Sequence, residues 1–213
     1  MNIKGLNAFQ LKVIALITMT IDHIGVFIFP DVEFLRIIGR ISFVIFAFFI
    51  GNAFIYTKNR KKFAIQLSLV ALIFEIVLFI LNVNTSSSIF LTLALGYNLI
   101  YVVHERKYWL AIPILIIPYF YNVDYSYYGI LLVYAGYYFH DNKIVYLLIN
   151  IALCMVFTTF SNISIIQYYS IIGCVLLLFY NEKEGFKLKY FFYLYYPLHI
   201  ILLSTLSYYI SFA

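Results

Sequence analysis

Six ionisable side chains lie within stretches of sequence that are otherwise apolar: Asp22, His23, Arg36, Arg40, Glu75 and His199. Inside a membrane such groups cost several kcal/mol unless they face a cavity or a partner. Histidine is the side chain best suited to accept a proton near neutral pH. The six residues are therefore the first candidates for chemistry, and proton transfer or general acid–base catalysis is the chemistry that they suit.

Three of these side chains are expected at one depth. His23, Arg40 and Glu75 each lie six or seven residues from the outer end of their own apolar stretch. At about 1.5 Å per residue of helix, this spacing places each of them about 9–10 Å below the outer boundary. The shared depth predicts a polar layer formed by three consecutive helices.

Lys12 and His23 are eleven residues apart on the first apolar stretch. In a helix this spacing returns to within about 20° of the same face, with an axial separation of about 16 Å. A cation at the cytoplasmic mouth would then lie below a buried imidazole. This arrangement suits a long anionic donor whose phosphates stay at Lys12 while its reactive end reaches His23, although a buried histidine can also be purely structural.

Structural roles are also open for the other ionisable residues. Arg36 and Arg40 share one helix face and could extend toward outer headgroups. Glu75 could be a buried counter-ion of Arg40 with no chemical role. Asp22 is adjacent to His23, therefore points to a different face, and could make a polar contact between helices.

The elements that carry these residues follow from the composition. The chain has 213 residues, of which 65% are hydrophobic and 11% charged, with a net charge of +5. An ordinary globular domain carries about 25% charged residues. This composition excludes a soluble enzyme, a disordered protein, a nucleic-acid-binding module and a secreted disulfide scaffold. Cys154 and Cys174 lie in apolar runs without metal or redox spacing, so they are interpreted as core residues and no metal is expected.

We therefore predict an all-α, polytopic integral membrane bundle of about nine transmembrane helices in one domain, 1–213. A helix needs about 20 mainly apolar residues to cross a bilayer. The predicted spans are 11–29, 34–57, 63–82, 88–103, 108–121, 126–140, 143–160, 164–180 and 189–210. The segment 108–121 is short and contains Pro113 and Pro118, so a tilted, kinked or re-entrant segment is the alternative there.

The charges of the connections predict the orientation. Basic connections alternate with neutral or acidic ones along the whole chain. Because cytoplasmic loops carry the excess of Lys and Arg, the N-terminus is expected inside and the C-terminus outside. The residues of the second basic connection, Lys58, Arg60, Lys61 and Lys62, then lie on the cytoplasmic side.

The sequence resembles the TraX family. The resemblance is carried by residues 11–15 (LKVIA), 19–25 (MTIDHIG), 35–43 (LRIIGRISF), 56–60 (YTKNR) and 196–199 (YPLH). The family is named for the conjugation protein that N-acetylates F-type pilin, and it is similar to the transmembrane acyltransferases. These share a basic residue and a histidine separated by ten residues on their first helix, a pattern that Lys12 and His23 match.

The resemblance implies a membrane-embedded acetyltransferase of the bacterial cytoplasmic membrane. Acetyl-CoA would be the cytoplasmic donor, and its phosphates would be held by Lys12 together with Lys58, Arg60 and Lys61. Charge-assisted hydrogen bonds suit such phosphates, although the last three residues could also serve only as topology signals. The acceptor would be a peptide amine or a glycan or lipid hydroxyl that reaches the site from the membrane or the outer face.

The resemblance also implies residue roles. His23 would be the general base, and Arg36 and Arg40 would polarise the thioester carbonyl or stabilise the developing oxyanion. Asp22 joins these three as a catalytic candidate. Glu75 and His199 are assigned to the acceptor side, with a packed histidine as the alternative for His199.

Two other functions fit the same residues. A small transporter could use His23, Arg40 and Glu75 as a proton or anion relay. A non-catalytic assembly factor would need these residues only for stability. In each case the expected partner is the lipid bilayer and not a nucleic acid.

Overall fold

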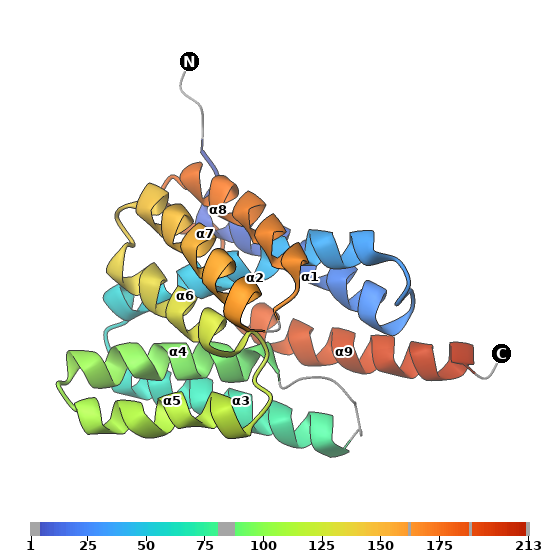
Figure 1. Ribbon diagram of the computed structural model, residues 1–213, viewed down its shortest axis with the longest axis horizontal. Coiled ribbons are helices and arrows are strands. Elements are labelled where there is room, and N and C mark those ends of the chain that lie inside the picture. The colour runs from blue at the N-terminus through green and yellow to red at the C-terminus, as the bar shows by residue number, and fades with distance from the viewer. Residues whose placement is uncertain (1–4, 81–87, 162, 188, 212–213) are drawn as a thin grey trace. The chain divides into compact units, whose positions relative to one another are not determined.

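A computed structural model of the protein describes residues 5–80, 88–161, 163–187 and 189–211 (Figure 1). Within these ranges the chain forms α-helices joined by short connections, and the predicted all-helical class is confirmed. The α-helices are α1 (Ala8–Phe27), α2 (Glu33–Tyr56), α3 (Arg60–Ile80), α4 (Ile89–His104), α5 (Ala111–Phe120), α6 (Ser126–Tyr138), α7 (Lys143–Phe160), α8 (Ser170–Leu178) and α9 (Lys189–Ser211). The 3₁₀ turns η1 (Tyr108–Leu110) and η2 (Ile165–Tyr169) precede α5 and α8.

Local capping residues explain where two of the helices begin. The Asn7 side chain accepts a hydrogen bond from the Gln10 amide, and the Gln10 side chain accepts one from the Asn7 amide, both at 2.9 Å. This reciprocal capping box satisfies amides that the first turn of α1 leaves without helical partners. Asn59 caps α3 in a similar way by accepting from the Lys62 amide at 2.9 Å.

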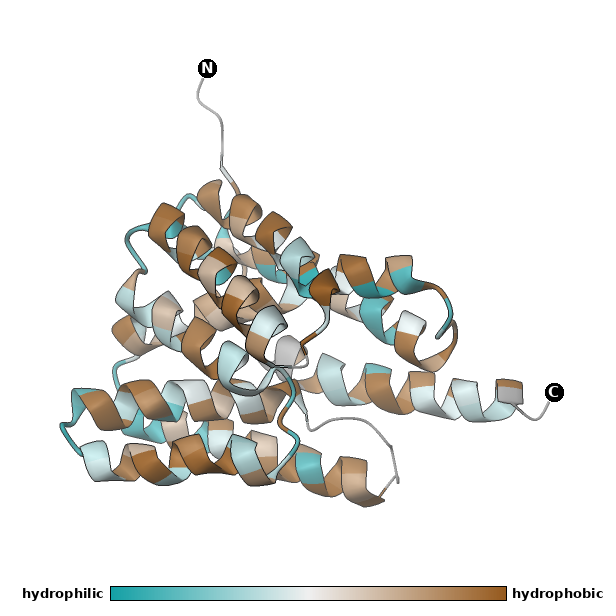
Figure 2. Ribbon diagram, viewed as in Figure 1, coloured by the Kyte–Doolittle hydropathy of each residue, from teal (hydrophilic) through white to brown (hydrophobic). Residues whose placement is uncertain are grey.

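The surface of the helices suits a membrane. Helices α1, α2, α3 and α7 are each long and apolar enough to cross a bilayer. Phe79 and Phe160 expose 86% and 84% of their surface, and most helical turns in Figure 2 are coloured as apolar. Helices α5 and α8, of ten and nine residues, are about 15 Å and 14 Å long, less than the hydrocarbon thickness of about 30 Å. The number of crossings and the orientation stay predictions.

The contacts divide the chain into two compact units, each described by itself. Unit 1 comprises Met1–Phe46 and Ser164–Ala213, and unit 2 comprises Ala47–Ile163, so that α2 contributes to both. Whether the chain forms one domain stays a prediction.

In unit 1, α1 packs against α9. The segment that follows α8 holds the start of α1, because the amides of Leu6 and Ala8 donate to the carbonyls of Phe179 and Lys183, both at 2.8 Å. These bonds connect the two sequence-distant parts of the unit and satisfy amides at the beginning of α1.

In unit 2, α4 packs against α3, α5 and α6, and α6 packs against α7. Gly136 on α6 permits a close approach to α2, because a Cβ at this position would lie 2.9 Å from the Phe48 Cα. Fully buried tyrosines such as Tyr97, Tyr128 and Tyr146 fill the space between these helices. Unit 2 is thus a helical layer with an aromatic core.

Candidate functional site

Two arginines of α2 share the carboxylate of Asp22 on α1. The Arg36 Nη1 lies 3.0 Å from Asp22 Oδ2, and the Arg40 Nη2 lies 3.0 Å from Oδ1 and 3.1 Å from Oδ2. Asp22 and Arg40 are buried, whereas the Arg36 side chain is 32% exposed. We call these three residues the charge cluster. Two guanidinium groups facing one carboxylate give the cluster a formal charge of +1.

A glycine makes the charge cluster possible. A Cβ at position 39 would collide with the carboxyl group of Asp22, so only glycine leaves room for this side chain against α2. Gly25 has a similar role two residues past His23, because a Cβ there would lie 2.9 Å from the Leu35 Cβ. The close approach of α1 and α2 at this level therefore depends on residues without side chains.

His23 on α1 is paired with His199 on α9. The Nδ1 of His23 lies 2.6 Å from the Nε2 of His199, and the ring planes are inclined by 26°. His199 is 6% exposed, whereas His23 is only partly buried. We call these two residues the histidine pair. The pair thus joins the two rings through one nitrogen–nitrogen contact between α1 and α9.

Two tyrosines hold the histidine pair. The carbonyl of Tyr195 lies 2.9 Å from the Nδ1 of His199, and the Tyr195 hydroxyl is 2.8 Å from the Thr20 hydroxyl on α1. The Tyr196 ring meets His23 and His199 edge-on, with centroids 5.9 and 5.3 Å away. Aromatic edge-to-face contacts of this kind restrict the orientation of a ring. The pair is therefore fixed from α9 as well as by its own hydrogen bond.

The charge cluster and the histidine pair are adjacent. Asp22 and His23 are sequence neighbours, and the charges of Arg36 and Arg40 act electrostatically on the His23 ring. Four of the sequence-predicted residues, Asp22, His23, Arg36 and Arg40, are thus brought together in unit 1. The proposed contact of Asp22 between helices is observed, because its partners are on α2.

The structure adds His199 to this group by its position beside His23, which the sequence analysis did not anticipate. A signal for this pairing was present, since His23 and His199 are the two histidines inside long apolar stretches. Nothing in the spacing of residues 23 and 199 shows that α1 and α9 pack together, so the pairing needs the tertiary structure.

Glu75 on α3 accepts hydrogen bonds from neutral groups of two other residues, Ser88 and Tyr121. Its Oε1 accepts hydrogen bonds from the amide and the hydroxyl of Ser88, both at 2.7 Å, and its Oε2 accepts one from the Tyr121 hydroxyl at 2.7 Å. The carboxylate that the structure gives to Arg40 is Asp22, and the interpretation of Glu75 as a counter-ion of Arg40 stays a prediction. Ser88 precedes α4, and an acceptor at a helix N-terminus stabilises the helix.

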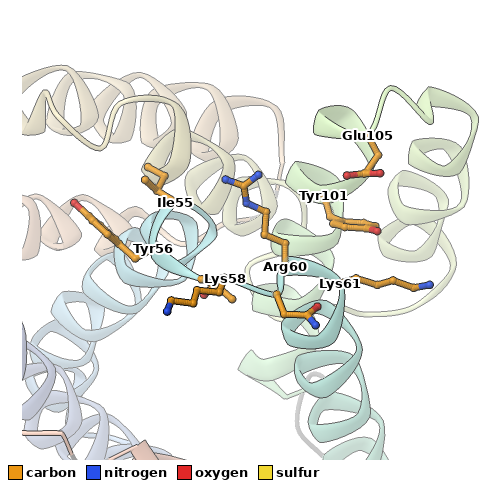
Figure 3. A pocket seen from close by; sticks show the side chains of 9 residues that line it. Ile55, Tyr56, Lys58, Arg60, Lys61, Tyr101 and Glu105 are labelled. Carbon is orange, nitrogen blue, oxygen red and sulfur yellow. The ribbon is translucent and has the colours of Figure 1, made fainter.

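A basic pocket opens at the ends of α2 and α4 in unit 2. It has a volume of about 540 Å³ and is lined by Ile55, Tyr56, Thr57, Lys58, Asn59, Arg60, Lys61, Tyr101 and Glu105. Figure 3 shows Arg60 in the middle of this lining, while Lys58 and Lys61 extend in opposite directions. In the part of the chain that the structure describes, neither lysine forms an ion pair, so both ammonium groups are available to an anion.

Arg60 is held in place more firmly than the two lysines. Its Nε donates to the Phe54 carbonyl at 2.9 Å, and its Nη1 donates to His104 Nε2 at 3.0 Å. The guanidinium carbon lies 4.6 Å above the centre of the Phe54 ring, a cation–π distance. His104 thus serves as an acceptor for Arg60, a role that the sequence alone does not predict.

Lys12, the other predicted phosphate ligand, lies on α1 in unit 1. The Glu184 carboxylate, on the connection that holds the start of α1, acts electrostatically on it. Glu184 also forms an ion pair with Lys187 at 3.0 Å. Among the described residues no group of three or more His, Cys, Asp or Glu side chains could hold a metal ion.

Comparison with known sequences places these residues in a family. The TraX protein family matches residues 8–207, which is most of the chain. The chain belongs to the TraX family. The matched region contains the residues of the charge cluster, the histidine pair and the basic pocket.

Two relatives show shorter similarity to this TraX-family chain. An uncharacterized protein of Rickettsia prowazekii (strain Madrid E) is 41% identical over 83 residues, which are 38% of this chain and 33% of that protein. A probable fimbrial assembly protein, FimC of serogroup H1, from Dichelobacter nodosus is 38% identical over 61 residues, which are 27% of this chain and 25% of that protein. The matches thus cover one third or less of each relative. No solved structure matches the chain.

Proposed function

We propose that this TraX-family protein is a multi-pass protein of the bacterial cytoplasmic membrane that transfers an acetyl group from cytoplasmic acetyl-CoA. The acceptor is an amine or hydroxyl at the membrane or the outer face. The observation that carries the proposal is the contact of His23 with His199 at 2.6 Å beside the charge cluster. It combines an oriented base with nearby positive charge, the two things that acyl transfer requires.

In the proposed reaction His23 is the single base, and one proton moves from the acceptor to the leaving thiolate. The His23 imidazole removes the proton of the acceptor as the acceptor nitrogen or oxygen forms a bond to the thioester carbonyl carbon. The carbon–sulfur bond then breaks, and the proton passes from the imidazolium to the departing thiolate. The products are the acetylated acceptor and free CoA, and His23 is returned to its starting state.

The charge cluster supplies electrostatic stabilisation in this proposal. Negative charge develops on the carbonyl oxygen as the new bond forms, and a preorganised positive group lowers the barrier. Arg36 is the more exposed arginine and the better placed to meet a substrate, whereas Arg40 is held by both oxygens of Asp22. Asp22 is then a positioning residue that orients the two guanidinium groups.

The basic pocket is the proposed site for the phosphates of the donor. Its volume and its three cations, Lys58, Arg60 and Lys61, fit a phosphorylated nucleotide better than an apolar ligand. The charge pattern predicts the same side of the membrane for Lys12, which we propose as a further phosphate ligand on the basis of its spacing from His23.

A protein acceptor is supported by the comparisons. The family is named for pilin acetylation, and a relative in Dichelobacter nodosus bears the name of a probable fimbrial assembly protein. We therefore propose the amine of a pilus or fimbrial subunit as the first acceptor to test, with glycan and lipid hydroxyls as alternatives.

The decisive experiment measures donor turnover by the purified protein in lipid nanodiscs with labelled acetyl-CoA. His23→Ala should lower kcat by about 10²–10⁴-fold, the usual contribution of a general base. His140→Gln is the matched control, because His140 bonds the Tyr137 carbonyl and Asp141 just after α6 and lies outside the proposed machinery.

Each alternative function gives another outcome. Equal turnover by the wild type and His23→Ala would contradict the catalytic assignment. Absence of acetyl-CoA binding together with a His23-dependent proton flux would support the transporter. Changes in protein abundance alone would support an assembly factor.

A further inference from the structure

The carbonyl of Tyr195 determines which nitrogen of His199 carries a hydrogen. A carbonyl oxygen can only accept a hydrogen bond, so the Nδ1 of His199, 2.9 Å away, must donate. A neutral imidazole has one N–H group and one lone pair. The Nε2 of His199 therefore carries the lone pair and faces His23 as an acceptor.

The lone pair on His199 Nε2 determines which nitrogen of His23 carries its hydrogen. The Nδ1 of His23 lies 2.6 Å from this acceptor, so it must be the nitrogen that bears the hydrogen. The lone pair of His23 is then on Nε2, the nitrogen not engaged by His199. We infer that His199 is a positioning residue that holds His23 in the Nδ1–H tautomer and leaves Nε2 as the basic atom.

The neutral state of the histidine pair follows from the charge cluster. The Asp22 carboxylate is already shared by Arg36 and Arg40. A resting imidazolium in the pair would add a buried positive charge next to two guanidinium groups, which costs free energy. Two neutral rings joined by one hydrogen bond avoid this cost.

The surroundings of His199 support an orienting role and not a second base. His199 is 6% exposed, and its ring lies against that of Tyr195 with centroids 5.1 Å apart and planes inclined by 20°. Tyr195 is in turn bonded to Thr20 on α1, three residues before His23. His199 thus contacts both the proposed base, His23, and a framework that connects α9 to α1.

This inference deepens the proposed function, on which its kinetic part rests. When His23 takes a proton at Nε2, its Nδ1–H still donates to a neutral acceptor, which stabilises the imidazolium that forms. The carboxylate of a serine-hydrolase triad fixes the tautomer of its histidine in the same way. In this protein the orienting partner, His199, is an uncharged imidazole and not a carboxylate, so it adds no charged group beside His23.

The direct test is nitrogen NMR of histidine rings in the full-length protein in nanodiscs. The chain has four histidines, and the spectra of His104→Gln, His140→Gln and His199→Gln assign three of them and leave His23 as the fourth. At neutral pH the wild type should show His23 with a protonated Nδ1 and an unprotonated Nε2. A protonated Nε2 on His23, or a charged ring, would overturn the inference.

Two variants of His199 distinguish the effect of its hydrogen-bond acceptor from the effect of its volume. His199→Gln retains an acceptor oxygen near the position of Nε2, so it should preserve the His23 tautomer and most of the turnover. His199→Phe fills the space without an acceptor, so the Nδ1–H form should be lost and kcat should fall by about 10–100-fold at unchanged KM for acetyl-CoA. Thermal unfolding of both variants identifies a loss caused by misfolding.

The outcomes distinguish this inference from the function on which it rests. If the tautomer depends on His199 but the wild type transfers no acetyl group, the acetyltransferase proposal fails and the positioning role stands. If transfer depends on His23 while His199→Phe leaves the tautomer unchanged, the positioning role alone fails. Equal damage by Gln and Phe at position 199 would also contradict it.

Discussion

Two carboxylates that lie in apolar helices, Asp22 in unit 1 and Glu75 in unit 2, have partners of different kinds. Asp22 binds two guanidinium groups, whereas Glu75 accepts three hydrogen bonds from the neutral groups of Ser88 and Tyr121. Glu75 stabilises the start of α4, and Ser88 and Tyr121 belong to the same unit as Glu75. Asp22 organises cations beside a histidine, which is a feature of reactive sites.

The position of a carboxylate within an apolar stretch therefore does not reveal whether its role is structural or chemical. Both carboxylates lie in apolar stretches and both satisfy the rule that such groups find partners. What differs is whether the partners are neutral hydrogen-bond donors, as for Glu75, or cations that lie beside a proton acceptor, as for Asp22. Three single substitutions test this difference and one double variant tests the basic pocket, from the largest expected effect to the smallest.

Arg40→Met should have the largest effect on stability. It removes the buried arginine that binds both oxygens of Asp22, and breaking a buried pair costs about 3–5 kcal/mol. Chemical unfolding of the protein in micelles measures the change. Arg36→Met, at a 32% exposed side chain, is the matched control and should cost less. Equal losses would show that the two arginines are not distinguished by burial.

Gly39→Ala should displace Asp22, because the added Cβ would collide with its carboxyl group. Overpacking of this kind costs about 1–3 kcal/mol, and donor turnover should fall with it. Gly96→Ala in unit 2 is the control, since its Cβ would lie 2.6 Å from the Val133 Cβ. It should lower the free energy of unfolding while turnover per folded molecule survives. Loss of turnover in both variants would remove the distinction between the units.

Glu75→Gln should have a smaller effect. The amide oxygen of glutamine can still accept from Ser88, so the expected loss is about 1 kcal/mol in the free energy of unfolding. The thermal midpoint is the measurement, with Tyr121→Phe as the matched removal of one donor to Glu75. A fall in kcat as large as that of His23→Ala would return Glu75 to the reactive site and contradict the contrast with Asp22.

The double variant Lys58→Ala with Lys61→Ala should change donor binding alone. Exposed charge contacts are worth about 0.2–1 kcal/mol each, so loss of two contacts should raise KM for acetyl-CoA by about twofold to thirtyfold at unchanged kcat. Lys143→Ala is the control, because Lys143 begins α7 and lies outside the lining of the basic pocket. An unchanged KM would contradict a role of these lysines in donor binding and leave them only as topology signals.

The sequence by itself determined the helices and the family. Hydrophobic runs and capping residues are local properties, so the predicted spans 34–57 and 143–160 correspond closely to α2 and α7. The motifs that resemble the TraX family lie within the region that the family matches. The spacing of Lys12 and His23 on one helix is local as well, and both residues lie on α1.

Only the tertiary structure decided the partners of the ionisable residues. Asp22 with Arg40, His23 with His199, and Glu75 with Ser88 and Tyr121 are pairs formed between different elements of the chain. Helical periodicity shows which face a side chain is on, but it contains no information about which helix lies opposite that face. Glycines such as Gly39 allow α1 and α2 to approach closely enough for this choice, and the chemistry of the site follows from it.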